Sequence, residues 1–326
     1  MRDNDSATSG VPIALGLAGL GVLIYSFTFP ATVYGLDGLN PYLIGVGRSA
    51  AAGALAAGVL LAVRAPRPRR DQLPGLAVVA AGVIFGFPVL TTLALDQGAS
   101  SSHSAVVIGL LPAATAVCAV VRAGERPSLM FWVAALAGTA CVTTFAVVRG
   151  AGHVSLADTL LFAALLAAAA GYAEGARLAR EMAGWKVISW ALVLAVPITV
   201  PVTLVLLATT SPVWSAKSTL GFAYLALFSA YLGFFAWYEG LARAGIARAS
   251  QLQLSQPLLT IVWSGILLSE PIDAATALTA MGVLVCVALA QRTRVRTTPA
   301  ARRPAPEKEK TPASWTRRSM SRLAGW

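Results

Sequence analysis

The sequence predicts an all-α membrane protein with about ten transmembrane helices arranged in two inverted five-helix repeats. The first observation behind this fold class is composition: of 326 residues, 57% are hydrophobic and 12% are charged. Soluble domains carry roughly 25% charged residues, so this chain is expected to lie in lipid. The second observation is a stretch of about thirty-five residues that occurs twice in the chain.

Apolar runs of membrane-spanning length follow one another along most of the chain. A bilayer core of about 30 Å requires about 20 apolar residues per helix. Short loops rich in Gly, Pro and Ser separate the runs. The ten predicted spans are residues 11–30, 41–63, 73–95, 102–121, 128–148, 156–177, 186–208, 218–241, 247–268 and 273–291.

The repeated stretch covers residues 103–138 and 249–282. Each copy has a proline inside an apolar run, then a Glu and a Pro, then a second apolar run with a glycine. The proline precedes the glutamate by 13 residues in both copies, and the second proline precedes the glycine by 11. These landmarks are Pro112, Glu125, Pro127 and Gly138 in the first copy and Pro257, Glu270, Pro271 and Gly282 in the second.

The duplication predicts how the chain is organised. Each repeat holds five spans, an odd number, so the two repeats must cross the membrane in opposite directions, as in many secondary transporters. We expect a cytoplasmic N-terminus over residues 1–10, a first repeat over 11–148, a second, inverted repeat over 156–291, and a basic, disordered cytoplasmic tail over 292–326.

Basic residues predict the orientation of the chain. With both termini in the cytoplasm, the inner segments hold 22 Lys and Arg and the outer loops hold only Arg149 and Lys217. Most of the net charge of +11 lies in the tail, and a basic tail beside a membrane favours anionic lipid headgroups over nucleic acid. The expected location is the cytoplasmic (inner or plasma) membrane, as a monomer or homodimer.

The composition predicts no cofactor and no metal. The three cysteines all lie in apolar runs, and two histidines are too few for a metal cluster. The chain shows no phosphate-binding loop of an ATPase, and no nucleophile–base set or metal motif of a membrane-embedded enzyme. A transporter is therefore favoured over an enzyme.

The paired landmarks resemble those of the EamA family of the drug/metabolite transporter superfamily, over roughly residues 11–291. Arg48, in GVGRSAAAG, is similar to an arginine that this family often has early in its second helix. The resemblance implies a ten-helix permease that exports amino acids or other small metabolites by alternating access. It also implies that helices 1, 3, 4, 6, 8 and 9 line the central cavity.

Two interpretations are open for each repeated landmark. Glu125 and Glu270 are either gating or coupling acids, or caps for the helix that follows, where Pro127 and Pro271 suit the first turn. The mid-membrane prolines Pro112 and Pro257 either produce a packing kink or curve their helices around a cavity.

Ionisable and amide side chains inside the spans are the other candidates. Glu174 either lies on the transport pathway, as intramembrane carboxylates usually do, or pairs with Arg177 at the membrane interface. Gln253 and Gln256 share a helix face, and they bind either a polar substrate or a neighbouring helix.

Together these arguments predict export of a small metabolite, an amino acid or a related compound. The alternative is an efflux pump for drugs or organic cations, which favours a deep acidic residue in a mostly apolar cavity. The predicted substrate-binding residues are Tyr25, Phe87, Thr91, Tyr172, Glu174, Tyr231, Trp237, Gln253 and Gln256.

Overall fold

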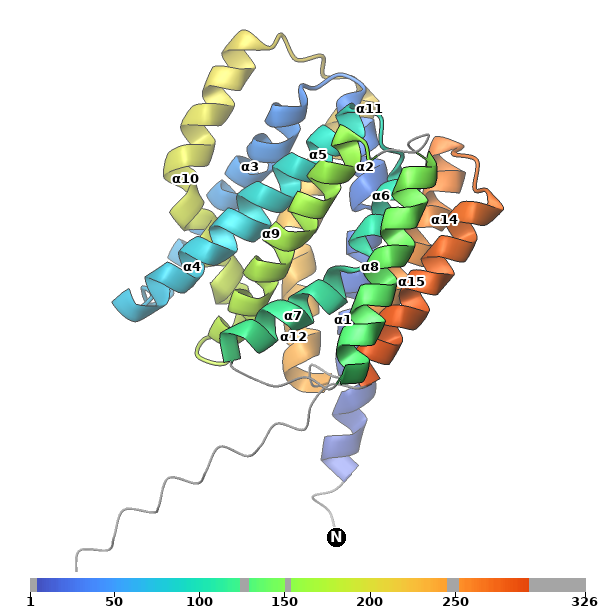
Figure 1. Ribbon diagram of the computed structural model, residues 1–326. Coiled ribbons are helices and arrows are strands. Elements are labelled where there is room, and N and C mark those ends of the chain that lie inside the picture. The colour runs from blue at the N-terminus through green and yellow to red at the C-terminus, as the bar shows by residue number, and fades with distance from the viewer. Residues whose placement is uncertain (1–4, 124–128, 150–153, 245–251, 293–326) are drawn as a thin grey trace, which may run out of the picture. The chain divides into compact units, whose positions relative to one another are not determined.

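The computed structural model describes residues 5–123, 129–149, 154–244 and 252–292, and all regular structure in these ranges is helical (Figure 1). Six helical stretches in this part of the chain are long and apolar enough to cross a membrane. They are Leu15–Leu36, Pro41–Ala62, Arg70–Asp96, Leu156–Leu178, Gly184–Thr209 and Ala216–Gly240. Shorter apolar helices cover Trp132–Phe145, Gln253–Leu268 and Ala274–Leu289. The predicted all-α class is confirmed over the described residues, and the length and composition of these helices are consistent with a membrane protein.

The helical elements follow one another with short connections. In the first part of the chain they are α1 (Asp5–Ser26), α2 (Thr28–Leu36), α3 (Pro41–Ala62), η1 (Arg70–Gln72), α4 (Leu73–Val79), η2 (Ala80–Gly86), α5 (Phe87–Asp96), α6 (Ser101–Ile108), α7 (Leu111–Ala123) and α8 (Leu129–Arg149). The later elements are α9 (Leu156–Leu178), α10 (Gly184–Thr209), α11 (Ala216–Tyr224), η3 (Leu225–Leu232), α12 (Gly233–Ala244), η4 (Gln253–Ser255), α14 (Gln256–Leu268) and α15 (Ala274–Arg292).

Several predicted spans are interrupted part-way along their length. Residues 102–121 were expected to form one helix, but α6 ends at Ile108 and α7 begins at Leu111. The segments η2 and η3 are π-helical turns inside otherwise α-helical spans. A glycine marks the end of each turn: η2 ends at Gly86, and η3 ends one residue before Gly233.

Prolines explain two of these interruptions and also the turn η4 (Gln253–Ser255). A proline has no N–H to donate to the carbonyl four residues earlier. Pro88, in the first turn of α5, frees the carbonyl of Ile84 in η2, and the hydroxyl of Ser49 in α3 donates to it at 2.9 Å. In the same way, Pro112 frees the carbonyl of Ile108 at the end of α6, and Pro257 frees that of Gln253 in η4.

Helices α8 and α15 pack side by side (Figure 1), and their contact is reciprocal. A β-carbon placed at Gly138 would lie 3.2 Å from Cβ of Cys286, and one placed at Gly282 would lie 3.2 Å from Sγ of Cys141. As the residue number rises along α8 it falls along α15, so these two helices run antiparallel. The landmark glycines therefore lie at equivalent places in one interface.

Polar contacts tie the helices together at two opposite ends, which are named here for one residue each. At the Glu270 end, Val213 donates its N–H to the carbonyl of Gly38 at 2.8 Å, and Glu270 accepts from the N–H of Ser101 at 2.8 Å. At the Arg69 end, residues 63–72 meet the turn after α9. The candidate site lies between these ends.

Candidate functional site

A narrow cavity lies among the interrupted helices, and helices from both halves of the chain line it. About 40 Å³ of it is open to water-sized spheres, which is room for a few waters. Its lining is Tyr25, Thr28 and Phe29; Arg48 and Ser49; Val83, Ile84, Phe87 and Pro88; Ile108 and Leu111; Tyr172; Ile188 and Leu192; Ser229, Ala230 and Phe234; and Gln256.

Helix interruptions surround this cavity. Thr28 lies at the break between α1 and α2, Ile84 lies in η2, and Ile108 lies at the end of α6. From the second half, Ser229 lies in η3 and Gln256 begins α14. Irregular backbone at membrane depth is tolerated where it is buried in protein or lines a cavity, and π-turns are frequent at functional sites.

Aromatic side chains form much of the wall. The rings of Tyr25 and Phe234 meet edge to face with centroids 5.3 Å apart, and the rings of Tyr172 and Phe234 do so at 6.3 Å. Phe29 and Phe87 complete the aromatic lining. Such a wall suits an apolar or cationic part of a small solute.

Arg48 is the one charged side chain among the described lining residues, and it is 3% exposed. Its Nε and Nη1 atoms have no hydrogen-bond partner in the part of the chain that the structure describes. The hydroxyl of Tyr25 is also buried there without a partner. Tyr172 lines the same cavity, and an ordinary phenol carries no charge near neutral pH.

The structure places four of the predicted substrate-binding residues in this cavity: Tyr25, Phe87, Tyr172 and Gln256. Gln253 lines a smaller neighbouring pocket, together with Pro112 and Pro257. Gln256 also lines this neighbour, so the two spaces share a wall. The glutamines and the repeated prolines of the two halves therefore meet beside the cavity.

Thr91, Tyr231 and Trp237 lie away from the lining. Thr91 turns its hydroxyl back to the carbonyl of Phe87 at 2.6 Å. The Tyr231 hydroxyl lies 3.0 Å from Oγ of Ser189, and Trp237 packs against α1 at Gly21. Neighbouring residues of the same elements, Phe87, Ala230 and Phe234, do line the cavity. The helix phase that turns a side chain inward depends on tertiary packing.

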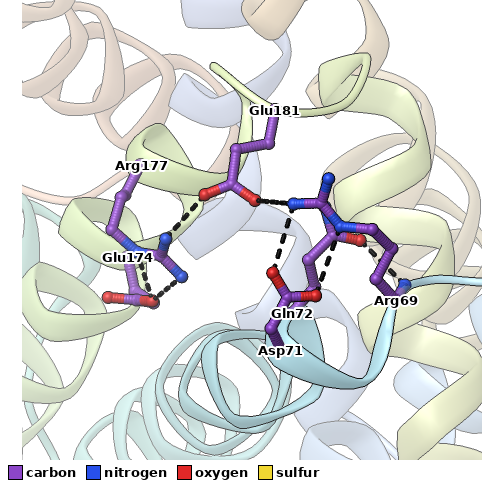
Figure 2. Close-up of polar contacts among 6 residues, drawn as sticks. All are labelled: Arg69, Asp71, Gln72, Glu174, Arg177 and Glu181. Carbon is purple, nitrogen blue, oxygen red and sulfur yellow. Dashed lines mark hydrogen bonds and ion pairs between the residues drawn. The ribbon is translucent and has the colours of Figure 1, made fainter.

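Glu174 lies at the Arg69 end and takes part in a polar network (Figure 2). Its side chain is 3% exposed, and its Oε1 accepts from Nε of Arg177 at 2.8 Å and lies 2.7 Å from Nη2 of the same residue. Arg177 also donates to Glu181, which accepts in turn from Arg69 and Gln72. This geometry corresponds to the interpretation in which Glu174 pairs with Arg177.

Glu270 accepts three hydrogen bonds from the start of α6. The backbone N–H of Ser101 and that of Ser102 donate to its two oxygens at 2.8 and 2.9 Å, and the Ser102 hydroxyl donates at 2.7 Å. The expectation that Glu270 caps the helix that follows it is therefore wrong. Asp273 caps that helix instead, by accepting from the N–H of Thr276 at 2.9 Å.

Two further side chains strengthen the Glu270 end. His103 of α6 lies 2.6 Å from Oδ1 of Asp158 in α9, and its ring stacks on Phe145 of α8. Sequence analysis did not single out His103 or Asp158 for this role, because their pairing depends on contact between distant helices. The counterpart glutamate Glu125 and its neighbour Pro127 lie outside the described residues.

Sequence reasoning also missed Thr28, Ser49, Pro88 and Ser229 as cavity residues. The hydroxyls of Thr28 and Ser229 lie 2.9 Å apart and join α2 to η3 across the two halves. The available signal was a polar residue or a proline inside an otherwise apolar run. Arg48 carried the clearest such signal, as a lone arginine inside a predicted span.

Comparison with known proteins gives one family match and two informative relatives. The sequence model of the EamA-like transporter family matches residues 12–146 and again residues 155–291. A Bacillus subtilis protein described as the uncharacterized transporter YdeK is 44% identical over 276 residues, which are 84% of this chain and 95% of that protein. A Streptantibioticus cattleyicolor protein described as a probable terminal-alkyne amino-acid exporter is 29% identical over 260 residues, which are 76% of this chain and 84% of that protein.

The fold is also found in a solved structure. A crystal structure of a protein that is 19% identical in sequence covers 86% of this chain and 96% of its own, with a TM-score of 0.59. At this identity the likeness shows a shared fold.

Proposed function

Because the chain belongs to the EamA-like transporter family, we propose that it is a secondary transporter that exports a small metabolite, an amino acid or a related compound, by alternating access. The family resemblance inferred from the repeated landmarks is confirmed by the two matches, and the relatives are named as transporters. The relative described as a probable terminal-alkyne amino-acid exporter supports the substrate class.

The observation that carries the proposal is the cavity among the interrupted helices. Its lining comes from both matched segments, and secondary transporters built from two repeats bind substrate between them, near the bilayer midplane. Helix interruptions at that depth supply the polar groups that a continuous apolar helix lacks. Alternating access would then expose the cavity first to one end of the molecule and then to the other.

We also propose that the chain crosses the cytoplasmic membrane ten times, in two inverted halves, with both termini inside. Two family matches in one chain support the duplication. The antiparallel packing of α8 and α15, with Gly138 and Gly282 in equivalent contacts, supports the inversion. The bias of basic residues towards one set of loops supports the orientation.

The cavity lining gives the organic-cation alternative no support. An efflux pump for lipophilic cations would favour an acidic residue at the site, whereas the described lining residues include an arginine and no acid. The buried carboxylate of Glu174 is engaged by Arg177 at the Arg69 end.

The proposed function is tested by comparing secreted metabolites in cells that overproduce the protein and in cells that carry an empty vector. We expect the protein to enrich small metabolites in the medium. Ala230→Phe should abolish the enrichment, because the larger side chain would fill the cavity. Leu232→Phe, on an exposed face of the same helical stretch, is the matched control and should retain it. Equal secretion with the vector, the wild type and Ala230→Phe would refute export through this cavity.

A further inference from the structure

We propose that Arg48 binds a carboxylate of the transported solute, so that this exporter selects small metabolites that bear a carboxylate over those that lack one. This inference rests on the proposed transport function and adds the chemical class of the substrate. It starts from a buried cation that the described part of the protein leaves without a counter-charge.

Arg48 lies within α3 and lines the cavity. It is the eighth residue of α3, roughly 10 Å along the helix from its start at the rise of 1.5 Å per residue. Its side chain is 3% exposed and borders the cavity. A charged side chain at such depth is expensive unless it is paired, and it usually marks the path of a substrate or ion.

The described part of the protein leaves most of this guanidinium unsatisfied. Two of its three nitrogens, Nε and Nη1, have no hydrogen-bond partner among the described residues. The buried carboxylates of those residues are engaged elsewhere, since Glu174 accepts from Arg177 and Asp158 pairs with His103. A buried arginine left in this state is suited to an anion that arrives with the ligand.

The guanidinium of Arg48 has a shape that suits a carboxylate. A guanidinium presents its N–H groups in a planar fork that matches the two oxygens of a carboxylate. The Tyr25 hydroxyl is a second buried donor without a partner in the described chain. Tyr172 also lines this cavity and supplies a further hydroxyl that can donate or accept a hydrogen bond.

The remaining walls define the rest of the solute. Tyr25, Phe87, Tyr172 and Phe234 offer ring faces and edges that suit an apolar side chain or an ammonium group. The Gln256 amide can accept from an ammonium group or donate to an oxygen. The fitting class is a small amino acid or related monocarboxylate with a mostly apolar side chain.

The test uses the full chain and four variants or controls, compared at matched abundance in the membrane. Culture media are compared by mass spectrometry for the vector, the wild type, Arg48→Gln, Arg48→Lys and Arg67→Gln. Arg67 lies in the exposed loop after α3, so its replacement removes an arginine away from the cavity. We expect the wild type and Arg67→Gln to enrich the same solutes, and these solutes to carry a carboxylate.

Arg48→Gln should lower that enrichment roughly 10- to 100-fold, the factor that corresponds to losing a hydrogen-bonded ion pair. Arg48→Lys keeps the positive charge but lacks the planar N–H fork of a guanidinium. Its export should therefore fall between that of the wild type and that of Arg48→Gln. Enriched solutes that lack a carboxylate, or undiminished export by Arg48→Gln, would overturn the inference and leave the transport function standing. No enriched solute in any strain would contradict the transport function itself.

A second measurement separates recognition from a structural role. The purified proteins are unfolded by heat in detergent without added solute. An unpaired buried cation destabilises the empty protein, so Arg48→Gln should unfold at the same or a higher temperature than the wild type. A lower unfolding temperature for both Arg48→Gln and Arg48→Lys would show that Arg48 holds the fold together, and would overturn its assignment to the substrate.

Discussion

At the residue scale, the charged side chains divide into those whose hydrogen bonds the described protein supplies and those that it leaves open. Glu174 and Glu270 are held by several donors, whereas the guanidinium of Arg48 retains two N–H-bearing atoms without partners in the described chain. Charged groups that are already paired stabilise one arrangement of helices. A cavity group without a partner is available to a ligand.

The two glutamines of the second repeat give a prediction at this scale. Gln256 lines the main cavity, whereas Gln253 lines only the neighbouring pocket. Gln256→Leu should therefore lower export at least roughly tenfold if its amide binds the solute, about the effect of one lost hydrogen bond in a dry site. Gln253→Leu should keep most of the activity, because leucine suits a helix in lipid.

The measurement is the rate of export of the enriched solutes, divided by the amount of protein in the membrane. Gln256→Asn, which shortens the side chain and keeps the amide, serves as the control for the chemical group. Full export by the Gln256→Leu and Gln253→Leu double variant would assign both amides to helix packing.

At the element scale, the ends of α6 and α14 show how the two halves are joined. Glu270 follows α14 and binds the first N–H groups of α6, where a carboxylate is favoured by the helix dipole. Ser264 of α14 also donates to Ser101 at 2.7 Å. These bonds tie an element of the first half to one of the second at the Glu270 end.

Loss of the Glu270 carboxylate should open that end more often. Glu270→Gln retains the size of the side chain but replaces one accepting oxygen with an NH₂ group and removes the charge. The hydrogen bonds to the backbone N–H groups of α6 should therefore weaken. In a background without the three native cysteines, a cysteine at Ser229 in the cavity should react faster with an impermeant thiol reagent added outside intact cells. Asp273→Asn weakens the cap of α15 without touching α6, and should leave the reaction rate near its starting value. Equal rates in Glu270→Gln and its parent would contradict a closing role for this contact.

At the scale of the whole molecule, the arrangement in the membrane follows from the basic residues and the duplication. The loop 63–72 is rich in arginine, and the loop between the two matched segments contains one. We expect the first loop in the cytoplasm and the second outside.

Cysteines placed singly at Pro68 and Gly152 test this topology in the cysteine-free background. An impermeant thiol reagent added to intact cells should label the cysteine at Gly152 and spare the one at Pro68, and permeabilised cells should label both. If the reagent labelled only the cysteine at position 68 in intact cells, the proposed orientation would be wrong.

The sequence by itself determined the class of the protein, its duplicated landmarks and its family. Composition, the spacing of apolar runs and repeated motifs are properties of the chain itself. They can be recognised without knowing which residues are in contact. The family resemblance that these landmarks carry implied which helices line the cavity, and Tyr25, Phe87, Tyr172 and Gln256 on those helices do line it.

Tertiary structure decided which side chains meet. It turned Thr91, Tyr231 and Trp237 away from the cavity, paired Glu174 with Arg177, and brought Glu270 to α6 instead of the helix that follows it. It also revealed that Nε and Nη1 of Arg48 have no hydrogen-bond partner in the described chain. The physical reason is common to all of these cases. Helix phase and interhelical pairing depend on residues far apart in sequence, and a side chain is satisfied or left open only once those residues are in place.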